Sequence, residues 1–256
     1  GMGRDKSARE SGGRAATEYP VWEAFTRAGA FEDTSAPTSV DRAPLTPGFI
    51  VEVHNLLTHS ECEAIIESCE RIGMQPSSVY DRQPRKGEAY LDRDSLRFFD
   101  AALAQQLWER LLPFIPQLDA RVAIGLRGDG ECGLVNELRF YRYTRGQRFG
   151  QHVDQSWRGP LPGVQTEYTL LIYLNTAGEP TRGHDQPLVG GDTVFMASAK
   201  RELARVTPRA GLALLHAHGQ RCLMHESTEV ERGVKYVLRA DVMFGAAQGS
   251  GHSPVL

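Results

Sequence analysis

The sequence has no hydrophobic run near the roughly 18 residues of a membrane-spanning helix, and no apolar signal-peptide core at its N-terminus. It also has no excess of charge of one sign, because 29 Lys and Arg stand against 32 Asp and Glu, for a net charge of −3. Such a chain lacks the general electrostatic attraction that draws basic proteins to nucleic acid or anionic membranes. These absences predict a soluble, cytoplasmic protein that binds neither nucleic acid nor membrane.

Cysteine is scarce, with 4 in 256 residues, and no Cys-x-x-Cys pair is present. Cys62 and Cys69 fall in one predicted helix, where a rise of 1.5 Å per residue separates them by roughly 10 Å, too far for a disulfide. A disulfide scaffold and a cysteine-based zinc or redox site are therefore not expected.

The length and composition fit one sizeable domain with its own core. Hydrophobic residues make up 41% of the 256, and 26 Gly with 14 Pro favour a chain with many turns over a helical bundle. Aperiodic, polar composition predicts a disordered tail over residues 1–18 and a second tail over 246–256. Scattered aromatic residues among Pro and Ser predict an extended N-terminal arm over 19–48, which leaves 49–245 as the folded domain.

Two amphipathic helices are predicted in the first half of that domain. Segment 49–57 is rich in β-branched residues and predicts a strand, after which Thr58 or Ser60 provides the N-cap of a helix that Gly73 ends. A second helix begins near Asp100 and stops before the following prolines. Apolar residues repeat at helical spacing in both, namely Cys62, Ile65, Ile66, Cys69 and Ile72 in the first and Leu103, Leu107 and Leu111 in the second.

The second half of the domain reads as strands. After about residue 120, β-branched and aromatic runs alternate with Gly-rich turn signals, and helical periodicity almost disappears. Strands at this density are typical of a jelly roll or barrel. We therefore predict an α+β, mainly β protein, in which a double-stranded β-helix (jelly-roll) core has supporting N-terminal helices.

His152-Val-Asp154 is the first candidate for chemistry. Residues i and i+2 of an extended segment point to the same side about 6.6 Å apart, so this imidazole and carboxylate can converge on one metal ion. Alone the pattern also fits a surface polar pair. His225 at the start of a later strand adds a second imidazole, and two His with one carboxylate form a facial triad that leaves Fe(II) open positions for a chelating cosubstrate and oxygen.

Lys235 adds a second feature, ten residues after His225. It lies on a strand that otherwise reads as apolar, VKYVLRADVMF. Burying its ammonium costs several kcal/mol unless an anionic partner is present. A carboxylate of a bound ligand would provide that partner.

Four segments together resemble the prolyl 4-hydroxylase-like group of 2-oxoglutarate and Fe(II)-dependent dioxygenases. The resemblance lies in their order and spacing and spans about residues 48 to 244. It identifies 49–245 as a prolyl 4-hydroxylase-like dioxygenase domain. The segments are Tyr143 to Asp154, the strand TLLIYLN ending at Asn175, the turn from Gly190 to Phe195, and His225 to Phe244.

The resemblance assigns a role to each candidate residue. It implies that His152, Asp154 and His225 bind Fe(II), and that Lys235 binds the distal carboxylate of 2-oxoglutarate. Phenols near the cosubstrate correspond to Tyr143 and Tyr173, although Tyr173 also fits a core tyrosine with a backbone partner. Arg239 is in phase with Lys235 on the same strand and is a candidate to share or replace its role. The implied cofactors are Fe(II), 2-oxoglutarate as cosubstrate, and O2, and ascorbate is left open.

The implied reaction is hydroxylation of a substrate, first of all a peptidyl proline or another protein residue, with release of succinate and CO2. A small-molecule substrate is the second possibility, since relatives act on both. The loops 75–96 and 155–167 are the expected substrate-binding segments.

Two alternatives stay open. The strand GLALLHAHG carries His216 and His218, and His216 stands where the family more often has an apolar or aromatic residue. These two with His225 would suit a cupin-type metalloenzyme, whereas the favoured interpretation makes them structural or supporting histidines. The other alternative is a non-catalytic metal-binding jelly roll, which Lys235 argues against, because a structural metal site has no use for a buried cation.

Overall fold

The computed structural model describes residues 40–42, 50–77, 88–117, 133–158 and 164–244. The tails predicted at 1–18 and 246–256, and nearly all of the predicted arm, lie outside the described residues. The domain boundaries therefore stay predictions, and the description that follows concerns the body of the predicted domain.

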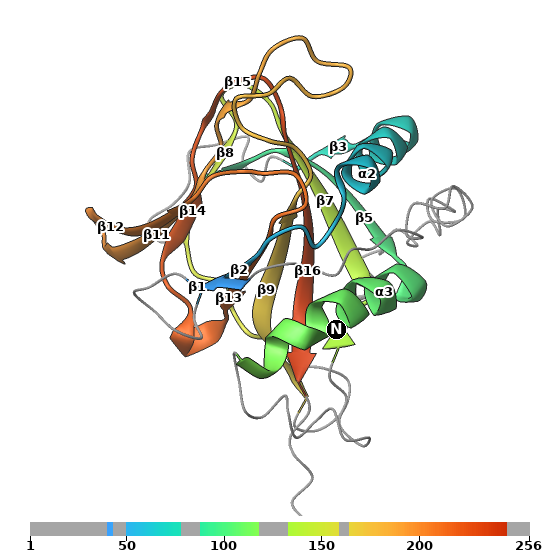
Figure 1. The fold of residues 1–256 in the computed structure, drawn as a ribbon. Helices are drawn as coiled ribbons and strands as arrows, with labels where there is room; N and C mark the ends of the chain where they lie inside the picture. Colours follow the sequence, from blue (N-terminus) through green and yellow to red (C-terminus); the bar gives the residue numbers. More distant parts are fainter. Residues whose placement is uncertain (1–39, 43–49, 78–87, 118–132, 159–163, 245–256) are drawn as a thin grey trace, which may run out of the picture.

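Two antiparallel sheets face each other and form the body of the molecule (Figure 1). The larger sheet has nine strands in the order β1-β2-β13-β9-β16-β7-β5-β3, with β6 beside β16. Its strands are β1 (Val40–Arg42), β2 (Ile50–Val53), β3 (Gln75–Pro76), β5 (Asp94–Phe99), β6 (Gly133–Leu134), β7 (Glu137–Tyr143), β9 (Gln165–Tyr173), β13 (Ala213–Ala217) and β16 (Lys235–Phe244).

The smaller sheet has five strands in the order β12-β11-β14-β8-β4, and β10 pairs with β15 separately. Its strands are β4 (Leu91–Asp92), β8 (Arg148–His152), β11 (Thr193–Ser198), β12 (Arg201–Val206) and β14 (His225–Ser227), and the separate pair is β10 (Val189–Gly190) with β15 (Val230–Arg232). The two facing sheets confirm the predicted jelly-roll core.

Both predicted helices form and begin at their predicted caps. Helix α2 (His59–Ile72) starts with a reciprocal capping box, in which Thr58 accepts from the amide of Glu61 and the Glu61 carboxylate accepts from the amide of Thr58. Helix α3 (Ala101–Leu111) is capped by Asp100, and a 3₁₀ helix, Leu112–Gln117, follows it. No helix among the described residues is long and apolar enough to cross a membrane.

The helices cover the outer face of the larger sheet, as Figure 1 shows. Glu61 is fully buried and accepts two hydrogen bonds from Arg110 of α3, at 2.7 and 2.9 Å, which ties the two helices together. On β16 the side chains of Tyr236 and Leu238 join this outer core, whereas Val237 joins a second core between the sheets. Strand alternation therefore turns Lys235, Val237 and Arg239 toward the interior of the jelly roll.

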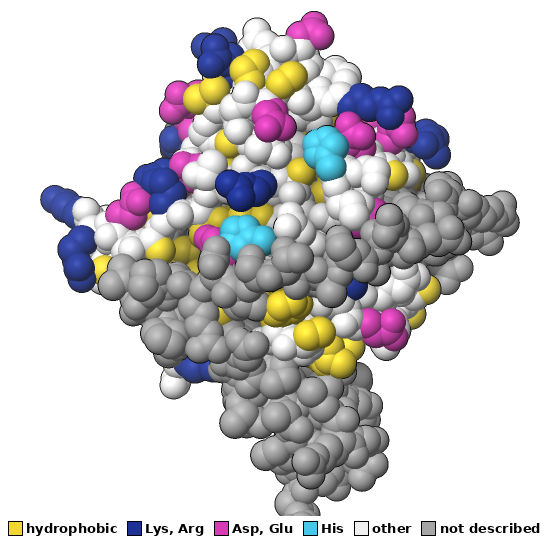
Figure 2. All heavy atoms as spheres, viewed as in Figure 1, with side chains coloured by type: hydrophobic (Ala, Val, Ile, Leu, Met, Phe, Trp, Pro, Cys, Tyr) yellow, Lys and Arg dark blue, Asp and Glu magenta, His cyan; other side chains and the backbone are white. Residues whose placement is uncertain are grey.

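The segment 75–96 was predicted to be a loop, and this was wrong at both ends. Strand β3 lies at its start, and β4 and the first half of β5 lie at its end. Only residues 88–90 and 93 of its second half are outside regular strands, and 78–87 lie outside the described residues. On the face shown in Figure 2, basic and acidic described side chains are interspersed and form no extended patch of one sign.

Candidate metal centre

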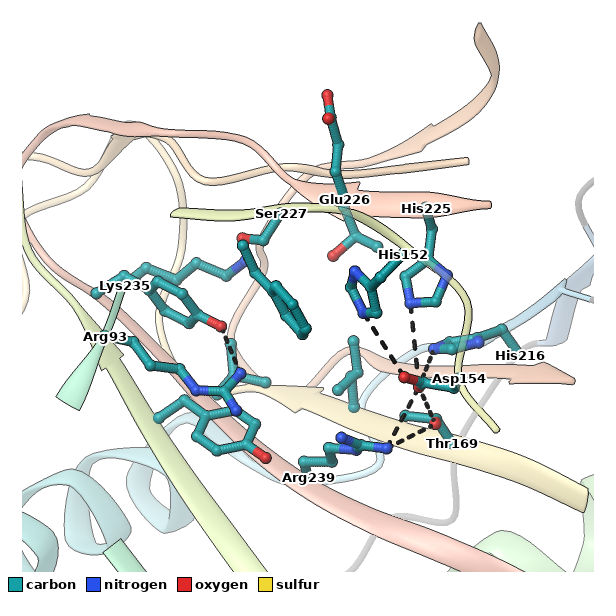
Figure 3. Close-up of a pocket in the computed structure, with 16 residues that line it drawn as sticks. Arg93, His152, Asp154, Thr169, His216, His225, Glu226, Ser227, Lys235 and Arg239 are labelled. Carbon is teal, nitrogen blue, oxygen red and sulfur yellow. Dashed lines mark hydrogen bonds and ion pairs between the residues drawn. The ribbon is translucent and has the colours of Figure 1, made fainter. Parts of the chain in front are cut away.

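Strands β8 and β14 bring two imidazoles next to each other. His152 and His225 are register partners in this antiparallel pair, and their ring centroids lie 4.2 Å apart. Asp154 follows β8, with its Oδ1 3.6 Å from His152 Nε2 and its Oδ2 4.0 Å from His225 Nε2 (Figure 3). Two atoms that bind one ion at about 2.1 Å cannot be more than about 4.2 Å apart, so the three groups can share one metal.

The hydrogen bonds of both imidazoles leave Nε2 free for a metal. Nδ1 of His152 donates to the Gly150 carbonyl at 2.8 Å, and Nδ1 of His225 donates to the Leu223 carbonyl at 2.9 Å. A carbonyl only accepts, so Nδ1 carries the hydrogen and Nε2 keeps its lone pair. Burial lowers the pKa of His152 to about 3 and lowers that of His225, so both rings are neutral at pH 7.

Asp154 is held ionised by the groups around it. Burial alone would raise its pKa, but Arg239 and then the surrounding imidazoles lower it well below the ordinary value. The Thr169 hydroxyl donates to Asp154 Oδ2 at 2.6 Å, and Arg239 lies 3.3 Å from the same oxygen. Two neutral imidazoles and one carboxylate are the donor set of non-haem Fe(II) oxygenases, so these residues fit iron.

A pocket between the sheets connects this group to Lys235 (Figure 3). Lys235 is 2% exposed, and its Nζ donates to Ser227 Oγ at 2.8 Å. No acidic side chain among the described residues forms an ion pair with it. Gly191 makes room for the lysine stem, because its φ is +76° and a Cβ there would lie 3.0 Å from Lys235 Cδ. The pocket therefore holds a buried cation without an anionic partner in the part of the chain described.

The two predicted tyrosines both lie near the lysine ammonium. Their ring centroids are 5.2 Å (Tyr143) and 5.5 Å (Tyr173) from Lys235 Nζ. Tyr143 lines the pocket. The Tyr173 hydroxyl donates to Thr193 Oγ1 at 2.6 Å, so its partner is a side chain and not the backbone group considered in the sequence analysis.

Arg239 lies at the metal end of the pocket. Its guanidinium is 3.3 Å from Asp154 and 3.3 Å from Asp241. Burial alone would lower the pKa of Arg239, but Asp154, Tyr141 and Asp241 raise it above its ordinary value. Two carboxylates therefore already pair with Arg239, whereas no ion pair of Lys235 is found among the described residues.

Arg93 lines the pocket as well, a position not predicted from the sequence. Its guanidinium stacks over Tyr141 at 3.4 Å from the ring centroid and donates to the Tyr143 hydroxyl at 3.0 Å. Leu96 and Phe98 of β5 join the outer core, so alternation along that strand turns Arg93 inward. That alternation was the available signal, and recognising β5 as a strand would have revealed it.

His216 of β13 and His218, which follows that strand, have different surroundings. His218 contacts Thr169 Oγ1 through Nε2 at 2.6 Å and Thr166 Oγ1 through Nδ1 at 3.1 Å, so both its nitrogens are engaged. His216 lines the pocket, and its Nε2 lies 3.7 Å from Asp154 Oδ2. Because His218 has no free nitrogen, the predicted cupin-type set of His216, His218 and His225 has little support.

Residues 138–240 match the model of the 2OG-Fe(II) oxygenase superfamily. This segment contains both histidines and the carboxylate of the candidate metal centre, as well as Lys235. The match supports an enzyme of this superfamily, for which the cofactors are Fe(II), 2-oxoglutarate and O2.

Solved structures with the same fold include two prolyl hydroxylases. The 2OG complex of the viral collagen prolyl hydroxylase from Paramecium Bursaria Chlorella virus-1 aligns with a TM-score of 0.53 and 15% identity, over 76% of this chain and 96% of that one. A Pseudomonas putida prolyl-4-hydroxylase aligns with a TM-score of 0.50 and 18% identity, over 75% and 91% respectively. At these identities the likeness shows the fold. The search of the curated proteins found no match.

Proposed function

We propose that this oxygenase hydroxylates a peptidyl proline or another residue of a protein substrate and converts 2-oxoglutarate to succinate and CO2. The observation that carries the cosubstrate assignment is the single pocket with a His/Asp group at one end and the unpaired Lys235 at the other. The fold shared with two prolyl hydroxylases supports a peptide as the first substrate class to test.

In this proposal His152, Asp154 and His225 hold the iron. The bound iron, with 2-oxoglutarate and O2, supplies the oxidising chemistry. Arg239 keeps Asp154 ionised, and the Thr169 hydroxyl orients the carboxylate. The pocket lies between the facing sheets, and its partly buried surroundings strengthen the charge interactions inside it.

The opposite end of the pocket is suited to a carboxylate. Lys235 supplies an ammonium, and Arg93 adds a second positive charge. Arg93 donates into the oxygen of Tyr143, so the phenol's own hydrogen is available to a ligand oxygen. We assign binding of the distal carboxylate of 2-oxoglutarate to Lys235 and Tyr143. The hydroxyl of Tyr173 is already bonded to Thr193, so we assign to Tyr173 only the packing of its ring near the lysine.

Product analysis tests the function directly. Purified protein with Fe(II), 2-oxoglutarate and O2 should form succinate, and a peptide library should yield peptides that gain the mass of one oxygen atom. Asp154→Ala serves as the inactive control. Succinate formation with oxidised metabolites but no oxidised peptide would retain the oxygenase and reject the protein substrate.

Binding of 2-oxoglutarate should take up protons above pH 7. Burial lowers the pKa of Lys235 to about 7; Asp192 opposes this shift, and Arg93 adds a smaller contribution to it. Tyr143 and Tyr173, which also face the ammonium, have raised pKa values and stay neutral. A bound carboxylate raises the pKa of Lys235 again, so above pH 7 binding requires protonation of Lys235, and affinity should fall by up to about tenfold per pH unit.

Calorimetry in buffers with different ionisation enthalpies measures this proton uptake at pH 8. Lys235→Arg is the matched control, because a guanidinium stays charged throughout this range and should take up none. Equal uptake by the wild type and Lys235→Arg would show that another group titrates.

A further inference from the structure

His216 is a buried imidazole with no hydrogen bond. It is 2% exposed, and neither Nδ1 nor Nε2 has a hydrogen-bond partner among the described residues. It pairs in register with Thr169 across β13 and β9, and both side chains line the pocket beside Asp154 (Figure 3). Leaving a buried polar group unsatisfied costs about 1–3 kcal/mol, so this ring can accept a partner that the described residues do not supply.

Distance alone would allow His216 to bind the metal. Its Nε2 is 3.7 Å from Asp154 Oδ2, within the same range as the other two imidazoles. The ring lacks, however, the support that a metal-binding histidine normally has. Such a ring donates its second N–H to a carbonyl or carboxylate, as His152 and His225 do, whereas Nδ1 of His216 has no acceptor in the part of the chain described.

Packing limits where the His216 ring can point. The ring of Phe195 lies edge-on to it with centroids 5.5 Å apart, and the His225 ring lies 4.4 Å away on the metal side. Figure 3 places His216 beside Asp154 and His225, at the end of the pocket away from Lys235. A ligand group bound next to the metal would therefore lie close to the His216 ring.

We propose that His216 does not bind the metal but donates a hydrogen bond to the carboxylate of the 2-oxo acid that lies next to the metal. This inference rests on the proposed function of the pocket. It assigns the two ends of one dicarboxylate to different residues, the distal end to Lys235 and the proximal end to His216. The site would then recognise the 2-oxo acid by a neutral donor at one end and a cation at the other.

Anaerobic titrations of the Fe(II)-loaded protein with 2-oxoglutarate and with oxalate test the two carboxylate contacts separately. His216→Leu should leave Fe(II) affinity within about threefold but weaken 2-oxoglutarate by about 10-fold to 100-fold, the loss expected for a hydrogen bond to a charged group. The visible charge-transfer absorption of the complex should also shift. Oxalate, which lacks the distal arm, should lose affinity in His216→Leu and keep it in Lys235→Ala.

His216→Asn is the second variant, because it keeps an N–H donor in a small side chain and should recover part of the lost affinity. Thermal unfolding by circular dichroism checks that each variant is folded. A fall in Fe(II) affinity of about 100-fold in His216→Leu would make His216 a metal ligand and overturn the inference. Unchanged 2-oxoglutarate and oxalate affinities would also overturn it, whereas failure of the wild type to bind 2-oxoglutarate would overturn the proposed function itself.

Discussion

Replacing His152, Asp154 or His225 with Ala should each lower Fe(II) affinity by at least about 100-fold and abolish turnover, because three donors that share one ion act as a unit. Iron content after dialysis and calorimetric titration of Fe(II) measure the loss. His59→Ala is the matched control, since this histidine is exposed on α2 and outside the metal group. Normal iron content in His152→Ala would disprove the assignment.

Asp154→Ala needs a separate stability measurement. Removal of this carboxylate leaves Arg239 with Asp241 as its remaining ion-pair partner among the described residues. Loss of one partner of a buried charge pair destabilises a protein by itself. A thermal melt of the iron-free variant therefore separates loss of the metal site from loss of the fold, and Asp154→Asn keeps the side-chain shape as a second comparison.

Lys235→Ala should weaken 2-oxoglutarate binding by about 10²-fold to 10³-fold, because a ligand carboxylate left unpaired in the pocket costs roughly 3–5 kcal/mol. Fe(II) binding should survive. Lys235→Arg should retain part of the affinity, since its charge remains but its planar fork approaches a carboxylate differently. Anaerobic titration of the Fe(II) protein at fixed salt gives the three dissociation constants.

Arg239→Ala distinguishes the two candidate anchors. Because Arg239 pairs with Asp154, its loss should weaken Fe(II) more than it weakens 2-oxoglutarate binding to the loaded protein. The opposite order would make Arg239 the anchor.

Lys235→Met should raise the melting temperature of the ligand-free protein, because it removes a buried ammonium whose burial is unfavourable.

The sequence predicts the helices and the central strands well, for physical reasons visible in single residues. Thr58 and Glu61 form a capping box that depends only on local chain, and Asp100 caps α3 in the same way. Strand β12 gives no such local signal, because its segment RELARV is half exposed at the edge of a sheet and lacks an apolar face. Edge strands form through pairing with a neighbour, which local sequence does not reveal.

The residues of the candidate site were likewise predicted from the sequence only in part. His152, Asp154, His225 and Lys235 were proposed from motif order and spacing, and the structure brings them to one pocket, while their roles stay predictions. The sequence did not predict that Arg93 lines the pocket or that the His216 ring is buried without a hydrogen bond to the described residues. The partners of a buried nitrogen come from distant strands. Only the folded structure therefore shows that Arg93 stacks on Tyr141 and that His216 has no hydrogen-bond partner among the described residues.

His152 and His225 are register partners across β8 and β14, so binding of one metal ion by both depends on the alignment of these two strands. A slip of one residue in this ladder would turn His225 to the outer face of the smaller sheet, since side chains alternate along a strand. Only the native alignment presents both imidazoles to one ion, so iron loading selects it from competing alignments. Amide hydrogens in β8 and β14 should then exchange more slowly in the iron-loaded protein than in the iron-free one.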